Sequence, residues 1–173
     1  MERKTVLATK LAEIITGAIG KNPNCRVLFS QQDTKKVVDF SDGLIVNLDS
    51  SEVMEKFSGL LLMSKLVSKD DLRGAARSDL KSWQVDEELI ALKDLSPEQT
   101  KKVFSLQLSR IVHSLLEWPA INFKVSVGDT AAPARRKKPL YIEEMLLHLY
   151  RVAPDPDAIS LIEIQKNQLF QIA

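Results

Sequence analysis

The amino-acid sequence predicts an α+β fold, in which a small antiparallel sheet is interrupted by an inserted helical repeat. Three observations support this prediction. The pair Asp42-Gly43 stands between two apolar runs, a strong hairpin signal because both central turn positions need a positive φ. Residues 121–127 alternate apolar and polar side chains, as a strand with one buried face does. Between these two signals, residues 57–80 and 85–108 carry the same helix-turn-helix pattern.

The elements before the repeat are a helix and a meander. Apolar residues recur at helical spacing over residues 5–19, which predicts an amphipathic helix that ends within the Gly/Asn/Pro-containing residues 20–24. A three-stranded antiparallel meander follows over residues 26–48. Its strands are expected at residues 26–29, 36–40 and 44–48. Asp49-Ser50-Ser51 then caps a predicted helix over about residues 52–64.

The repeat is predicted to consist of two helix-turn-helix units, the second beginning 28 residues after the first (57 to 85). In this alignment Leu61 meets Leu89 and Ser68 meets Ser96, and each leucine is expected in an equivalent buried place. Each serine has the position of an N-cap. The helix after Ser96 is expected to be the longest and to run to about Trp118, because a proline follows.

The later strand, residues 121–127, is expected to pack against the meander with one buried face. Residues 128–138 have no periodicity and predict a loop, and Pro139 then opens a helix that runs to about Val152. The apolar residues between Ile159 and Ile172 are expected to pack on this domain, on a second copy or on a downstream region. The expected division is a domain over residues 1–152, with its helical insertion at about 52–118, and a C-terminal segment over residues 153–173.

Composition narrows the functional classes. The 173 residues carry a net charge of +1, which points to neither nucleic acid nor an acidic membrane as a partner. A single cysteine, Cys25, excludes an internal disulfide and fits a reducing compartment. No apolar run approaches the roughly 20 residues that span a bilayer. We therefore expect a cytoplasmic protein.

The sequence offers no constellation of catalytic, cofactor-binding or metal-binding residues. His113 and His148 have no histidine or cysteine at i+3 or i+4, so they are expected on helix surfaces or partly buried. Cys25 has no nearby histidine in sequence and is expected to be a buried structural thiol. We therefore expect a protein that is not an enzyme and needs no cofactor.

Two features are candidates for binding a partner. One is the basic run Arg135-Arg136-Lys137-Lys138, which suits an acidic partner or phosphate and whose alternative is a solvated loop. The other is Trp83, between the repeat copies, which is an interface anchor if it is exposed. Trp118 is expected in the core instead, because it falls at helical spacing from Leu115 and Ile111.

Four motifs occur in order along the chain. The hairpin carries Phe40, Gly43, Ile45 and Val46, and the leucine-rich turn carries Leu61, Leu62, Leu66, Val67 and Ser68. The end of the long helix carries Ile111, Val112, Leu115, Leu116 and Trp118, and the last strand carries Phe123 and Val125. With these motifs the chain resembles, over roughly residues 5–152, the bacterial PATAN (PatA N-terminal) domain family in its version with an α-helical insertion. It departs from the family at Asn24-Cys25-Arg26, where a Gly-x-Leu start is usual.

This resemblance implies a non-catalytic adaptor in bacterial signalling, docking a receiver domain, a kinase-type regulator or a small GTPase. Self-association through a helical face is a further expectation, since homodimers are common. The repeat also resembles the N-terminal domain of secretion and pilus assembly ATPases, some of which bind cyclic di-GMP. That implies a cyclic-dinucleotide sensor as the alternative. Its Arg-Leu-Gly starts correspond to Lys56-Phe57-Ser58 and Gln84-Val85-Asp86, so its four glycines are replaced, at Ser58, Lys65, Asp86 and Lys93, and only Gln107 matches its end.

Overall fold

The computed structural model describes residues 2–76, 79–128 and 138–152. Within them, the predicted α+β fold is confirmed. The helices are α1 (Glu2–Lys21), α2 (Phe57–Met63), α3 (Lys69–Ala75), α4 (Ser82–Leu92), α5 (Pro97–Glu117) and α6 (Ile142–Val152), with a short 3-10 helix η1 (Val53–Glu55). The strands are β1 (Cys25–Gln31), β2 (Thr34–Ser41), β3 (Leu44–Ser50) and β4 (Asn122–Val127).

The four strands form one antiparallel sheet in the order β3-β2-β1-β4. The hairpin signal is confirmed, because Asp42 and Gly43 have φ values of 51° and 75° and connect β2 to β3. The later strand joins the meander beside β1, with Phe123 opposite Phe29. The helical segment between β3 and β4 is therefore an insertion in the sheet, as predicted.

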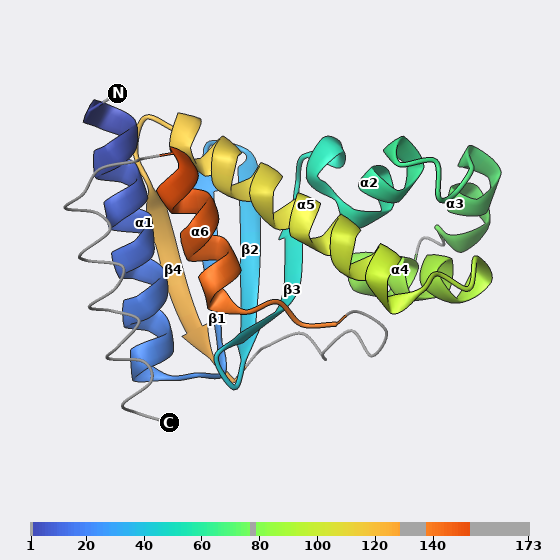
Figure 1. The fold of residues 1–173 in the computed structure, drawn as a ribbon, viewed down its shortest axis with the longest axis horizontal. Helices are drawn as coiled ribbons and strands as arrows, with labels where there is room; N and C mark the ends of the chain where they lie inside the picture. Colours follow the sequence, from blue (N-terminus) through green and yellow to red (C-terminus); the bar gives the residue numbers. More distant parts are fainter. Residues whose placement is uncertain (1, 77–78, 129–137, 153–173) are drawn as a thin grey trace.

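One face of the sheet is covered by α1, α5 and α6, and the insertion α2–α4 extends beyond β3 (Figure 1). The core lies between these two layers, where Phe29 and Phe40 of the sheet and Phe104 of α5 are fully buried. Phe104 also meets Phe57 of α2 edge-on, with ring centroids 6.5 Å apart. The long helix α5 thus joins the sheet layer to the insertion.

The repeat is confirmed as two helix-turn-helix units, but its alignment needs a correction. Ser68 and Ser96 both form capping boxes, with Asp71 and Gln99 respectively. The preceding helix ends, however, show a different correspondence. The amide of Leu66 donates a hydrogen bond to the carbonyl of Leu61, and the amide of Leu95 donates one to the carbonyl of Ile90. Leu61 therefore corresponds to Ile90 rather than to Leu89, because the first turn contains one additional residue, Val67.

The helix expected at about 52–64 is wrong as a single element. Strand β3 continues to Ser50, so Asp49 and Ser50 lie in the sheet and do not cap a helix. Glu55 turns into the interior, and extended backbone at Lys56 separates η1 from α2. Gly59 permits this break, since a Cβ at that position would lie 2.5 Å from the carbonyl oxygen of Val53.

Two further expectations are corrected. The last described helix begins at Ile142 instead of Pro139, because Leu140 forms a β-bridge with Ile45 at the outer edge of β3. Strand β4 has no buried face: Phe123, Val125 and Val127 are 46%, 38% and 61% exposed. Period-two alternation predicted this strand correctly, but the described residues leave its side chains exposed, whereas those of the other edge strand, β3, are covered.

Candidate functional site

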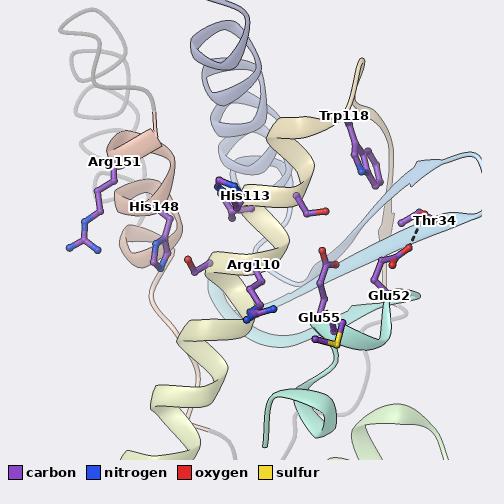
Figure 2. Close-up of a pocket in the computed structure, with 12 residues that line it drawn as sticks. Thr34, Glu52, Glu55, Arg110, His113, Trp118, His148 and Arg151 are labelled. Carbon is purple, nitrogen blue, oxygen red and sulfur yellow. Dashed lines mark hydrogen bonds between the residues drawn. The ribbon is translucent and has the colours of Figure 1, made fainter. Parts of the chain in front are cut away.

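A groove of about 720 Å³ runs over the outward stripe of α5, and we call it the α5 groove. Ser109, Arg110, His113 and Ser114 of α5 line its floor. His148 and Arg151 of α6 line one side, while Glu52 and Glu55 around η1 and Trp118 line the other. Figure 2 shows the α6 side chains and the η1 side chains on opposite sides of α5.

The sequence of α5 explains why this stripe faces outward. The capping box at Ser96 and Pro97 in the first turn begin the helix. Its apolar face, with Phe104, Leu108 and Ile111, is buried against the sheet and α2. The polar positions between those residues are left on the opposite side, where they form the floor of the groove.

Beneath the groove lies a buried ion pair. Lys36 of β2 is fully buried and its Nζ donates to Oε2 of Glu55. Ser50 Oγ donates to the same carboxylate oxygen at 2.7 Å, and Lys36 Nζ lies 5.7 Å from the centroid of the Trp118 ring. These contacts satisfy Glu55 and anchor η1 to the sheet, so this carboxylate is a structural group rather than a poised base.

The side of the groove near α6 is cationic. Arg110 and Arg151 make no ion pair within the described part of the chain. Burial and the neighbouring Arg151 lower the pKa of His148 below its ordinary value, and Glu144 partly opposes this shift. His148 is therefore mainly neutral near pH 7 and gains its proton only in more acidic solution. An anionic group in the groove would favour the protonated form.

The other side of the groove carries acidic groups that already have partners. Glu52 accepts a hydrogen bond from Thr34 Oγ1 at 3.2 Å, and Glu55 is held by Lys36 and Ser50. His113 lies with its Nε2 3.9 Å from Glu117 and is exposed. The groove thus offers binding groups of both signs, and its two carboxylates are already engaged by neighbouring side chains.

The partner-binding candidates from the sequence lie elsewhere. Trp83 is the second residue of α4 and is partly buried. Lys138 is exposed and lies two residues before Leu140, which forms the bridge to β3. Arg135, Arg136 and Lys137 lie outside the described residues. None of the described candidates lines the α5 groove.

Two positions of the nucleotide-binding alternative, Lys93 and Gln107, already have partners within the chain. Lys93 Nζ lies 2.8 Å from the carboxylate of Asp71 and forms an ion pair with it. This contact and the hydrogen bonds with Ser68 lower the pKa of Asp71 to about 2. Gln107 is buried and its Nε2 donates to the backbone carbonyls of Glu55 at 2.9 Å and Leu48 at 3.3 Å. The side chain that matched the end of the motif therefore faces the core.

Other expectations from the sequence agree with the structure. Cys25 is fully buried, and burial, with a smaller contribution from Asp39, raises its pKa. Trp118 is buried, as predicted, and caps the end of α5. Asp39 on the opposite face of the sheet is paired with Arg26 at 2.6 Å and accepts a hydrogen bond from Asn47 at 2.9 Å.

Arg110, Arg151 and the Lys36–Glu55 pair were not predicted from the sequence. Arg110 and Arg151 lie 41 positions apart (110 to 151) on two helices, so only the packing of α6 against α5 brings them to one groove. Lys36 and Glu55 resemble ordinary surface charges in the sequence. The one available signal for Lys36 was its place two residues before Val38 and four before Phe40, on the apolar face of the strand.

Among the described helices, none has the length and apolar character needed to cross a membrane. The described residues also contain no cluster of three or more His, Cys, Asp or Glu side chains that would hold a metal ion. Comparison of the chain with protein-family models, with curated proteins and with solved structures gives no match.

Proposed function

We propose that this protein is a non-catalytic interaction module of bacterial signal transduction and that a signalling partner docks in the α5 groove. The observation that carries the proposal is the cationic side of the groove, where Arg110 and Arg151 have no ion-pair partner among the described residues. Such cations at the side of an open groove favour a partner with an acidic segment, because complementary charge steers association and selects partners. His148 lies on the same side and adds a positive charge when it is protonated.

The shape of the groove supports a protein segment as the occupant. Small side chains, Ser109 and Ser114, lie in its floor, so the backbone of a partner can approach α5 closely. Met54 beside it is 55% exposed and offers an adaptable apolar contact. The resemblance to the PATAN family supports a receiver domain, a kinase-type regulator or a small GTPase as the partner.

A cyclic dinucleotide is the alternative ligand. Its phosphates would meet the same cations, Arg110 and Arg151, which are better placed for an anion than the engaged positions of the helical repeat. This alternative predicts a small-molecule sensor instead of an adaptor.

The experiment starts with the full chain carrying a photo-crosslinking amino acid at Ser114, in the floor of the groove. A protein captured from a bacterial lysate would then be purified and titrated calorimetrically. The variant Arg110→Glu/Arg151→Glu should weaken binding at least about tenfold, since it replaces attraction by repulsion. The matched control is Lys69→Glu/Lys102→Glu, which changes the charge equally at two exposed lysines outside the groove and should bind as the wild type does.

A second titration uses cyclic di-GMP as the probe. Saturable binding that the arginine variant abolishes and the lysine control retains would support the nucleotide alternative. Unchanged partner affinity in a correctly folded arginine variant would overturn the groove as the docking site. Binding should also strengthen as the pH is lowered through the depressed pKa of His148, because the third cation then forms.

A further inference from the structure

Strand β4 offers a docking surface separate from the α5 groove. It pairs with β1 along one side, from Cys25 opposite Val127 to Ser30 opposite Asn122. In the described structure its other side is the edge of the sheet. An edge strand presents unpaired backbone donors and acceptors, which another extended strand can satisfy.

The exposed side chains of β4 are apolar on one face. Phe123, Val125 and Val127 alternate with polar residues and lie beside the buried Phe29, Val27 and Cys25 of β1. They therefore continue the apolar face of the sheet to its outermost described strand. A strand that covers them must carry apolar side chains with the same period of two.

Strand β4 itself meets this requirement, and we propose that two copies of this chain associate through antiparallel β4–β4 pairing. The two four-stranded sheets then form one continuous antiparallel sheet. Directly opposite residues share a face, so a two-fold axis perpendicular to the sheet must pass midway between the two copies of one β4 residue, which then pairs with itself.

Charge selects the register. An axis at Lys124 would place two Lys124 ammonium groups directly opposite each other, which is unfavourable. An axis at Val125 places Val125 opposite its own copy, Phe123 opposite Val127, and Lys124 opposite Ser126. This register joins both apolar stripes and keeps the two lysines apart. The geometry therefore assigns the axis to Val125 and replaces the helical interface expected from the sequence by an edge-strand interface.

Cysteine cross-linking tests the register directly. With the axis at Val125, the two Val125 Cα atoms are about 4.5 or 5.5 Å apart, depending on the type of pair. That distance suits a disulfide. The two Lys124 Cα atoms are separated by about 8 Å, from two residue rises along the strand and one strand spacing across it, which exceeds the roughly 7 Å limit for a disulfide.

We expect Val125→Cys, in the full chain with Cys25→Ala, to form a covalent dimer under mild oxidation. Lys124→Cys in the same background should remain largely without a covalent cross-link, and Cys25→Ala alone is the control for the background. Equal cross-linking of both variants, or cross-linking only at position 124, would overturn the proposed register.

Light scattering tests the association itself. The wild-type chain should show twice its 19.4 kDa mass at tens of micromolar, and Val125→Arg should shift it to a monomer. Val125→Thr keeps the β-branched shape and should remain a dimer. Because Val125 is exposed, the arginine variant should keep the circular dichroism spectrum of the wild type. A monomeric wild type would overturn the proposal, and it is the outcome expected if the apolar residues between Ile159 and Ile172 of the same chain cover β4.

Discussion

Strands β3 and β4 form the two outer edges of the same sheet, yet their side chains are buried to very different extents. In β3, Ile45 is fully buried and Leu48 is 2% exposed, whereas Val127 of β4 is 61% exposed. Both strands are rich in apolar residues and both are antiparallel to their one neighbour. Their sequences therefore do not explain the difference.

The cover over β3 comes from three segments: the residues before α6, helix α5 and the short helix η1. Leu140 bonds the backbone of Ile45 in both directions, at 2.9 and 3.0 Å. Helix α5 packs over the same strand (Figure 1), and η1 is tied to its end through Glu55, Ser50 and Lys36. Strand β4 has no equivalent among the described residues. An edge is thus protected by what the rest of the chain places beside it, and the unprotected edge is the one suited to association.

The largest expected effect concerns the ion pair that holds η1 against β3. Replacing Lys36 with Met leaves the carboxylate of Glu55 buried without its cation, which should reduce the free energy of unfolding by about 3–5 kcal/mol. Urea unfolding followed by circular dichroism measures this loss in the free energy of unfolding. Lys35→Met removes the same charge at the neighbouring exposed position and should change stability by less than about 0.5 kcal/mol. Similar losses in both variants would show that the buried pair does not hold this edge.

The second effect compares the two edges directly. Leu140→Ala removes a fully buried side chain from the cover of β3 and should cost about 2–5 kcal/mol. Val127→Ala removes an exposed side chain from β4 and should stay within about 0.5 kcal/mol at protein concentrations too low for association. Thermal and urea unfolding of the two variants measures both losses in the free energy of unfolding. Equal costs would mean that the two edges are equally covered.

The third effect tests the close approach of η1 to α2. In Gly59→Ala the new methyl group meets the carbonyl oxygen of Val53, so the backbone must shift, at a cost of about 1–3 kcal/mol. Gly74→Ala is the matched control in α3, where an added Cβ meets nothing within 4 Å. There the alanine should be neutral or stabilise by up to about 1 kcal/mol, because it favours the helix. A neutral Gly59→Ala would contradict the tight contact.

The smallest effect concerns the strand next to the open edge. The pKa of the Cys25 thiol is raised in the folded chain, so folding favours its protonated form. The stability this contributes is present below the unfolded pKa of about 8.5 and is lost as the pH rises through the folded value. The free energy of unfolding should therefore fall above about pH 8.5 in the wild type. Cys25→Ala should show a shallower fall over the same range, and identical pH profiles would remove the thiol as the cause.

Local patterns predicted most of the elements. The Asp42-Gly43 turn, the capping serines Ser68 and Ser96, and the proline after Trp118 depend on interactions within a few residues, so the sequence was sufficient to place them. The helix expected at about 52–64 failed for the opposite reason. Its break depends on Lys36, which lies 19 positions from Glu55 and gives no local sign of that contact.

The candidate site was less predictable than the fold. The basic run and Trp83 were chosen because clustered charge and an aromatic residue are visible in a linear sequence. Arg110 and Arg151 are single charges on separate helices, and only the packing of α6 against α5 places them together. The same is true of the open edge, since alternation in residues 121–127 predicts a strand but says nothing about its outer neighbour.

The sequence alone determined the α+β class, the hairpin, the repeated helix-turn-helix units and the insertion of the repeat into the sheet. These features follow from turn chemistry, capping and periodicity, which act over short distances along the chain. Only the tertiary structure decided which edge of the sheet is covered, where Lys36 and Glu55 meet, and which cations share the α5 groove. Those outcomes depend on contacts between segments far apart in sequence, where burial is set by the neighbours that packing supplies rather than by the residues themselves.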